Sequence, residues 1–211
     1  MTAPERVARR CLIVFARVPR LHAVKTRLAA SIGPEQALAA HRALLRRTLE
    51  VAAAARADSR WLQFAGTDED QACAQLGAEF GLRVSPQPDG DLGERMAVAL
   101  DQALDSHERA VLIGSDCPVL RPADLVEAFE ALGSADLVLS PAEDGGYAMI
   151  GVARIGLPVF SQVDWGSDRV LRQTLAQAAS AGLRVRQLRT VWDVDTVDDW
   201  KRWQALPEQA A

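Results

Sequence analysis

Short apolar runs typical of buried strands alternate with helical stretches along this chain. Cys11 to Ala16 is one continuous apolar run, and Gly33-Pro34 then opens a long helical stretch, since proline suits the first turn of a helix. Further strands are expected at Arg60–Ala65, Leu82–Ser85, Ala110–Ile113, Ala135–Leu139, Tyr147–Val152 and Leu183–Val191. Helices are expected at Glu69–Phe80, Leu92–Leu104, Pro122–Leu132, Ser167–Ala181 and Thr196–Ala205. This alternation predicts an α/β fold with a mostly parallel central sheet and helices on both faces.

A single domain is expected to span residues 1–211, because no linker, repeat or low-complexity segment divides the sequence. Hydrophobic residues make up 49% of the chain. A chain of this length can bury roughly 70% of the surface that its unfolded form exposes, so one core is sufficient. The first long helix should turn an apolar stripe towards that core, formed by Leu38, His41, Leu45, Leu49 and Ala52.

The charge balance and the cysteines limit the classes of partner and compartment. With 24 basic and 28 acidic residues the net charge is −4, and no basic tract could follow a nucleic-acid backbone. We therefore expect no nucleic-acid partner. No apolar run approaches the length that spans a membrane. The 3 cysteines are widely spaced and form no CxxC pair, which favours a reducing compartment and a cytoplasmic protein. The oligomeric state stays open.

Three aspartates beside strand-like runs could hold a divalent cation. Asp116 lies in the motif GSDCP, where a proline ends the extended run at the carboxyl edge of the sheet. Asp193 and Asp195 are two positions apart, so in extended backbone they share a face. Carboxylates gathered at one edge favour Mg²⁺ or Mn²⁺ as counter-charge. Alternatively, Asp116 caps a turn, and Asp195 or Thr196 caps the last helix together with Asp199.

Acids and glycines meet in the segment Glu143-Asp144-Gly145-Gly146-Tyr147. Glycines let backbone approach a ligand closely because they lack a Cβ atom. We interpret this segment as the acceptor side of a site, with Asp144 or Glu143 as the catalytic base and Gly145, Gly146 and Tyr147 in contact with the acceptor. A plain hairpin would also use the two glycines, but it gives no reason for the adjacent acids.

Basic residues follow the first strand. Arg17, Lys25 and Arg27 could grip the di- or triphosphate of a nucleotide, and solvated surface charge is the alternative. Trp165 and Ser167 open a later helix whose free amides could receive a carboxylate, a phosphate or a sugar hydroxyl of the acceptor. An ordinary helix cap explains Ser167 equally well.

The loop from Gln87 to Met96 leads into another helix. Asp91 and Glu94 form the sequence pattern of a capping box. Because helix N-termini attract anions, Gly90 and Glu94 are candidate nucleotide contacts, although the acids of this loop make it a poor phosphate cradle. A simple helix entrance is the alternative.

Six motifs occur in an order that resembles a known family. They are FAR at 15–17, VKTRL at 24–28, GDLGERM at 90–96, GSDCP at 114–118, PAEDGGY at 141–147 and DVDT at 193–196. The sequence is similar to the GT-A, or nucleotide-diphospho-sugar transferase, superfamily, in a bacterial branch known as arsenosugar-biosynthesis-type glycosyltransferases. It resembles more distantly the phosphoenolpyruvate or 2-phospholactate guanylyltransferases. By this likeness Asp116 matches the central metal-binding aspartate, and Asp193 and Asp195 match a later metal-binding pair.

One departure from that family concerns the phosphate side. Members usually carry a Pro-Gly turn shortly before VKTRL, whereas this chain has Leu21-His22 and no glycine between Leu12 and Ile32. A glycine-rich phosphate cradle is therefore not expected, and the phosphates would depend on Lys25 and Arg27.

Three functions remain open on the sequence alone. The first is metal-dependent glycosyl transfer from a nucleotide sugar to a small-molecule acceptor, which the family resemblance implies. The second is nucleotidyl transfer from an NTP to a small phosphorylated acid, whose anionic group needs no base. The third is a non-catalytic nucleotide-binding protein.

Overall fold

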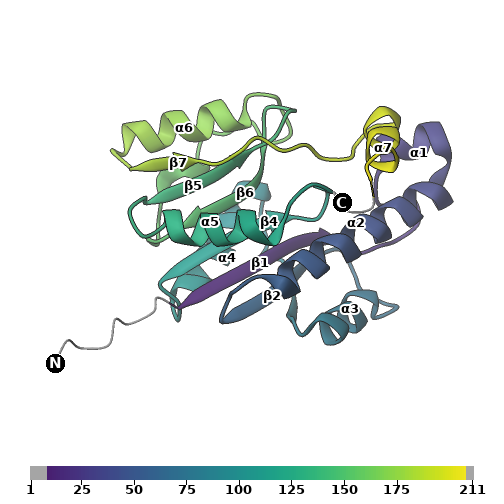
Figure 1. The fold of residues 1–211 in the computed structure, drawn as a ribbon, viewed down its shortest axis with the longest axis horizontal. Helices are drawn as coiled ribbons and strands as arrows, with labels where there is room; N and C mark the ends of the chain where they lie inside the picture. Colours follow the sequence, from purple (N-terminus) through teal and green to yellow (C-terminus); the bar gives the residue numbers. More distant parts are fainter. Residues whose placement is uncertain (1–8, 208–211) are drawn as a thin grey trace.

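The strands join in one twisted sheet in the order β3-β2-β1-β4-β6-β5-β7 (Figure 1). The protein is described by a computed structural model over residues 9–207. The strand bounds are Arg10–Arg17 (β1), Ser59–Ala65 (β2), Arg83–Pro86 (β3), Arg109–Gly114 (β4), Leu137–Pro141 (β5), Tyr147–Val152 (β6) and Val185–Gln187 (β7). β6 runs antiparallel to both β4 and β5, and the other neighbouring strands are parallel. The prediction of a mostly parallel sheet is therefore confirmed.

Helices cover both faces of this sheet. Their bounds are Thr26–Ile32 (α1), Pro34–Ala54 (α2), Ala72–Phe80 (α3), Leu92–Leu104 (α4), Pro122–Ala131 (α5), Val170–Ser180 (α6) and Val197–Gln204 (α7), with a short 3-10 turn at Pro158–Phe160. Alternate residues of each strand point to opposite faces. In β1, Leu12 and Val14 pack in the layer of α2, α3 and α5. Cys11, Ile13 and Phe15 pack in the layer of α4 and α6.

The sequence predicted a buried stripe on α2 and a capping box at the start of α4. In α2, His41, Leu45, Leu49 and Ala52 are buried as expected, whereas Leu38 is only half-buried. The capping box that opens α4 is present, because Asp91 and Glu94 each accept a hydrogen bond from the other's backbone N–H. Among the described residues, no helix combines the length and apolar character needed to cross a membrane.

Some element boundaries differ from the sequence-based expectation. The final strand was expected over Leu183–Val191, but β7 ends at Gln187 and the chain continues along β5 in irregular conformation. α6 begins at Val170, so the expectation that Ser167 caps it was wrong. Ser167 instead lies in a turn, where its hydroxyl accepts from the Arg169 N–H at 3.2 Å.

A small third cluster joins α1 to α7. Leu28 of α1 packs with Trp192 and Val194, and Trp200 and Trp203 of α7 lie against the same cluster. In Figure 1 the yellow α7 lies beside α1 and α2, at the end of an irregular segment that crosses over from β7. α1 was not expected from the sequence, because this helix of 7 residues carries only one buried side chain, that of Leu28. The cluster holds the segments on either side of the candidate site together.

Candidate functional site

Two adjoining cavities open at the carboxyl ends of β1 and β4. Ligands of open α/β sheets bind at this kind of position, where the strand order reverses. The first cavity measures ≈ 570 Å³ and the second ≈ 480 Å³. Asp116 and Asp195 line both of them, as does Arg27. The two cavities therefore meet at two of the three predicted metal ligands.

The first cavity is the basic one. Arg17, Lys25 and Arg27, predicted as phosphate contacts, all line it. Arg95, Gln87 and His41 line it too and were not predicted as site residues. Asp116 and Asp195, at its border with the second cavity, are the acidic residues of its lining.

The second cavity is acidic with an aromatic wall. The predicted residues Asp144, Gly146, Tyr147, Trp165 and Ser167 line it, together with the predicted ligand Asp193. Asp168 also lines it and was missed in the sequence. The structure thus gathers most of the predicted acceptor residues beside the predicted metal ligands.

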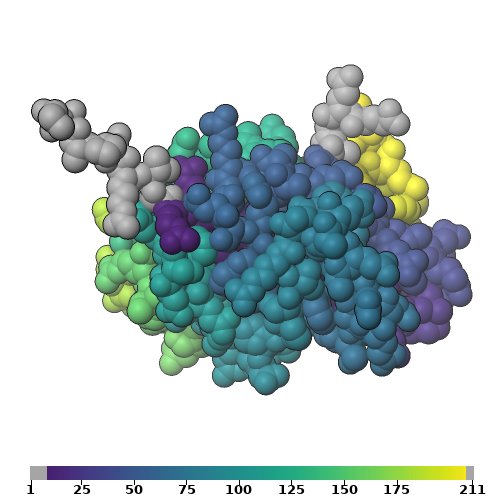
Figure 2. All heavy atoms as spheres, turned by 90° about the horizontal axis from the view of Figure 1, so that it is seen from below, coloured from purple at the N-terminus to yellow at the C-terminus, as the bar shows by residue number. Residues whose placement is uncertain are grey.

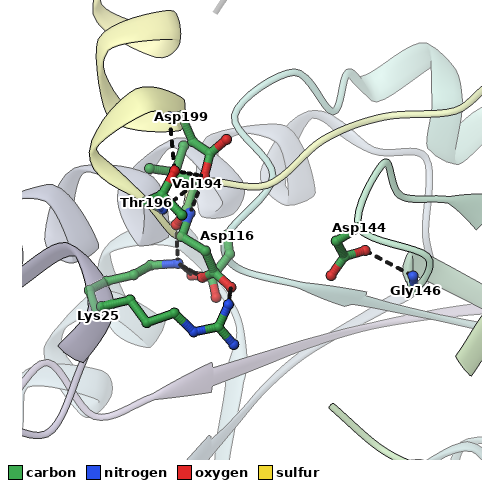
Figure 3. Close-up of polar contacts among 9 residues, drawn as sticks. Lys25, Asp116, Asp144, Gly146, Val194, Thr196 and Asp199 are labelled. Atoms are coloured by element: carbon green, nitrogen blue, oxygen red, sulfur yellow. Dashed lines mark hydrogen bonds and ion pairs between the residues drawn. The ribbon is translucent and has the colours of Figure 1, made fainter. Parts of the chain in front are cut away.

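Lys25 connects the two sides of the site (Figure 3). Its ammonium donates to the Val194 carbonyl at 2.5 Å and to Asp195 Oδ1 at 3.2 Å. The same nitrogen lies 3.0 Å from Asp116 Oδ1, as an ion pair without hydrogen-bond geometry. Only 4% of the Lys25 side chain is exposed. Arg27 is 75% exposed and approaches Asp195 Oδ2 at 3.8 Å. Lys25 is therefore the principal internal counter-charge of this acidic site.

Asp193 lies in the most crowded part of the acidic side. Burial raises the pKa of its carboxyl to about 6, and the charges of Asp144, Asp195 and Asp116 act in the same direction. Carboxylates that oppose each other's ionisation are suited to a hard divalent cation with oxygen ligands. As they stand, the described residues contain no group of three or more acidic, histidine or cysteine side chains at ligating distances. The donor chemistry fits Mg²⁺ or Mn²⁺, while Lys25 lies where two of the carboxylates face each other.

The two acids of the β5–β6 hairpin differ in their surroundings. Glu143 forms a two-point ion pair with Arg202 of α7, at 2.7 and 3.0 Å, and this hydrogen bonding lowers the pKa of the carboxyl. Arg202 in turn stacks over the Trp192 ring at 4.2 Å. Asp144 points to the second cavity and accepts one hydrogen bond, from the Gly146 N–H at 2.8 Å. Of the two, Asp144 is the one that remains available for a ligand.

Gly145 allows the hairpin to dock on the start of α6. Its φ is +89°, and a Cβ atom there would lie 2.2 Å from the Asp168 carbonyl oxygen. The Gly145 carbonyl accepts from the Leu171 N–H at 2.9 Å. Gly145 therefore shapes the second cavity from behind and does not line it.

The aromatic wall is formed by two predicted residues. The rings of Tyr147 and Trp165 pack edge to face, with centroids 6.5 Å apart. Burial raises the pKa of the Tyr147 phenol, so the hydroxyl stays protonated and the ring carries the contact. A Cβ atom on Gly93 would lie 2.6 Å from the Trp165 indole, so this glycine lets the wall pack on α4.

Gly90 and Glu94, predicted as nucleotide contacts, do not line either of the two cavities. Glu94 is engaged in the capping box of α4. The Gly90 carbonyl accepts from Arg95 Nε at 2.7 Å, and Arg95 does line the first cavity. The loop is therefore linked to the first cavity through Arg95.

The structure also shows which of the candidate residues cap a helix. Thr196 and Asp199 form the capping box of α7, so that interpretation holds for Thr196. Asp195 is not the cap, since its carboxylate pairs with Lys25 and Arg27. Asp116 does not cap α5, because the N-cap residue of that helix is Arg121.

Comparisons with known proteins support this picture of the fold. Residues 48–167 match the family described as "Uncharacterized protein conserved in bacteria (DUF2064)". A protein from Desulfovibrio desulfuricans G20, described as a nucleotide-diphospho-sugar transferase, is 32% identical with a TM-score of 0.82, over 89% of this chain and 83% of that one. None of the curated proteins compared with the chain matches it.

Two more distant structures share the fold alone. A CMP:2-keto-3-deoxy-manno-octonic acid synthetase complexed with CTP is 13% identical with a TM-score of 0.64, over 97% of this chain and 100% of that one. Rv0371c from Mycobacterium tuberculosis H37Rv, in complex with manganese, is 21% identical with a TM-score of 0.57, over 94% and 100%. The resemblance inferred from the six motifs is confirmed: the chain has the nucleotide-diphospho-sugar transferase fold and belongs to the DUF2064 family.

Proposed function

We propose that this protein is a metal-dependent glycosyltransferase that uses a nucleotide-sugar donor and a small-molecule acceptor. The fold relatives are transferases of nucleotide-sugar or nucleotidyl type, which supports transfer chemistry in general. One observation carries the finer proposal. The cavity lined by arginines and a lysine and the cavity lined by carboxylates and aromatic rings meet at Asp116 and Asp195.

The donor would bind with its diphosphate in the first cavity. Arg17, Lys25 and Arg27 supply charged donors there, and charge-assisted hydrogen bonds to phosphate are among the strongest in proteins. Asp116, Asp193 and Asp195 would hold Mg²⁺ or Mn²⁺, which when bound offsets the charge on the diphosphate leaving group. Rv0371c, which shares the fold, was crystallised with manganese.

The acceptor would bind in the second cavity, against Tyr147 and Trp165. Apolar rings with a few polar groups are typical of sites that orient small ligands. Asp144 would accept the proton that the acceptor hydroxyl loses as it attacks the sugar. Glu143 is held by Arg202 and would support the hairpin without touching the acceptor.

Nucleotidyl transfer is the second candidate, because the similar folds include a synthetase complexed with CTP. Transfer to a small phosphorylated acid fits the cavity less well. Its lining holds five carboxylates against a single cation, Arg27; they belong to Asp116, Asp144, Asp168, Asp193 and Asp195. An anionic acceptor there would meet like charges, which costs binding free energy.

Replacing Asp144 separates the two reactions. Asp144→Asn should slow glycosyl transfer by about 10²–10⁴-fold and leave donor affinity nearly unchanged, because a positioned base is lost. Glu143→Gln is the matched control, and it should retain most of the turnover. Near-normal turnover in Asp144→Asn, or release of pyrophosphate from an NTP by the wild type, would contradict the proposal. Ligand-induced stabilisation without any turnover would indicate a non-catalytic binding protein.

A further inference from the structure

The position of Lys25 conflicts with a simple role as a phosphate grip. Its ammonium faces three protein oxygens, on Val194, Asp195 and Asp116, at 2.5, 3.2 and 3.0 Å. The ammonium donates to the first two oxygens and forms an ion pair with the third, so all three hold it in place. With 4% of the side chain exposed, it presents almost no surface to a ligand in the first cavity.

The backbone of Lys25 is held in an uncommon conformation, which fixes the point from which its side chain extends. Lys25 has φ 50° and ψ 45°, in the left-handed region that residues with a Cβ atom seldom adopt. Such a conformation persists where the surroundings determine it. Here the surroundings are the Leu28 and Trp192 cluster behind α1 and the oxygens that surround the ammonium.

Charge balance gives this arrangement a consequence. Lys25 and Arg27 together match the charges of Asp116 and Asp195, but Arg27 is 75% exposed and 3.8 Å away, so Lys25 supplies most of the compensation. A divalent cation between the same carboxylates would lie against the ammonium, and like charges in such close contact repel each other. Lys25 and a divalent cation therefore compete for the same oxygens.

We propose that Lys25 is an exchangeable counter-ion, which neutralises Asp116 and Asp195 in the absence of a divalent cation and turns to the donor phosphates when the cation replaces it. This inference rests on the proposed function, since it takes a diphosphate to be the ligand of the first cavity. The cation and the phosphates then bind cooperatively, because each removes the cost that the other would meet alone. Linkage makes this coupling reciprocal.

Binding measurements on the wild type and three variants test the exchange without any assay of activity. Lys25→Gln removes the charge but keeps a donor for the Val194 carbonyl. Arg27→Gln is the matched control, with the same chemical change at a mostly exposed cation. Free Mn²⁺ is titrated by electron paramagnetic resonance, and inorganic pyrophosphate is titrated by calorimetry with and without Mn²⁺. Lys25→Met serves as a second neutral variant, and urea unfolding checks that each protein is folded.

The expected result is a crossover. Lys25→Gln should bind free Mn²⁺ about tenfold tighter than the wild type and bind pyrophosphate in the presence of Mn²⁺ about tenfold more weakly, within the usual range of coupled sites. Arg27→Gln should lose pyrophosphate affinity with little gain for Mn²⁺. Unchanged or weaker Mn²⁺ binding in both neutral Lys25 variants overturns the exchange, while wild-type binding of pyrophosphate with Mn²⁺ still supports the proposed function. Absence of pyrophosphate binding in all proteins contradicts the exchange and the proposed function together.

Discussion

At the scale of single residues, the second cavity depends on a glycine that does not line it. Gly145 combines a φ of +89° with an approach to the Asp168 carbonyl that excludes a side chain. Either constraint alone favours glycine. Together they fix how closely the β5–β6 hairpin sits on the start of α6, and thereby where Asp144 points.

Gly145→Ala should lower the free energy of unfolding by about 2–4 kcal/mol, because left-handed strain and a backbone clash add. Gly156→Ala is the control, since Gly156 has φ +67° but nothing within 4 Å of the added Cβ atom. The free energy of unfolding that Gly156→Ala loses should be about 1–2 kcal/mol, from backbone strain alone. Urea unfolding measures both. Equal losses in the two variants would mean that the contact with Asp168 relaxes without cost.

Residues of this site differ in how far the sequence could reveal them. Asp116, Asp193 and Asp195 follow strand-like runs, so their arrival at one sheet edge could be predicted. Gln87 could not, because its amide donates to the Ala16 and Gln63 carbonyls across 71 and 24 positions of chain. The Glu143–Arg202 ion pair spans 59 positions and could not be predicted from the sequence for the same reason. Local patterns carry no information about such contacts.

At the scale of elements, the segment between β7 and α7 is the least regular part of the site and delivers two of its carboxylates. Arg189 anchors it to α5 through two hydrogen bonds to Asp124, at 2.7 and 2.6 Å, and one to the Val119 carbonyl at 2.6 Å. Burial would raise the pKa of Asp124, but the hydrogen bonds from Arg189 and Arg121 outweigh it and hold the pKa at about 2. The Asp124 side chain is 5% exposed.

Arg189→Met should lower the free energy of unfolding by about 2–4 kcal/mol, because a buried carboxylate loses its main partner. In the wild type, folding lowers the pKa of the Asp124 carboxyl from 3.8, so this group stabilises the folded protein fully at pH values above 3.8. That stabilisation, about 2 kcal/mol, is lost as the pH falls from about 4 towards 2. Arg189→Met should show a weaker decline over this range.

Arg46→Met is the control for the Arg189 variant, since Arg46 pairs with Glu79 where both side chains are about half exposed. Exposed pairs of this kind contribute little to stability. The free energy of unfolding that Arg46→Met loses should therefore be clearly smaller and should change little with pH. Urea unfolding at several pH values checks both variants. An equal loss in the two would show that Arg189 does not anchor the segment.

Regular elements could be predicted well where their local sequence pattern is clear. β1, β4 and α4 lie within a few residues of their expected ranges, and the α4 bounds agree fully. The final strand was overestimated because Leu188 and Val191 are buried in the core although β7 itself ends at Gln187. α1 was missed because its position depends on the cluster shared with α7, which is distant in sequence.

At the scale of the whole molecule, the two cavities divide the charge of the site. The net charge of −4 conceals a basic half and an acidic half that share a border at Asp116 and Asp195. A ligand with a polyphosphate at one end and a neutral, hydroxyl-bearing group at the other matches both halves at once.

A panel of nucleotide sugars with Mn²⁺ should raise the melting temperature of the wild type by about 5–10 °C at about 100 times the dissociation constant of the preferred ligand. Asp193→Asn should show a higher melting temperature without ligand, because it relieves repulsion with Asp144, Asp195 and Asp116, and it should lose the metal-dependent shift. Differential scanning fluorimetry measures both. A destabilised Asp193→Asn that keeps the metal-dependent shift would mark Asp193 as structural.

The strand order also separates the two halves of the site along the chain. Residues of β1 and α4 with the loops beside them form the first cavity, whereas the β5–β6 hairpin and the segment before α6 supply most of the second. In the view from below, purple to teal segments of the first half make up most of the surface, and green segments of the second half lie at one end (Figure 2). Substitutions in the hairpin can thus accumulate without disturbing the basic cavity that we propose for the donor phosphates. If the proposed function holds, relatives of this protein can diversify in what they modify while they inherit an unchanged way of holding the activated donor.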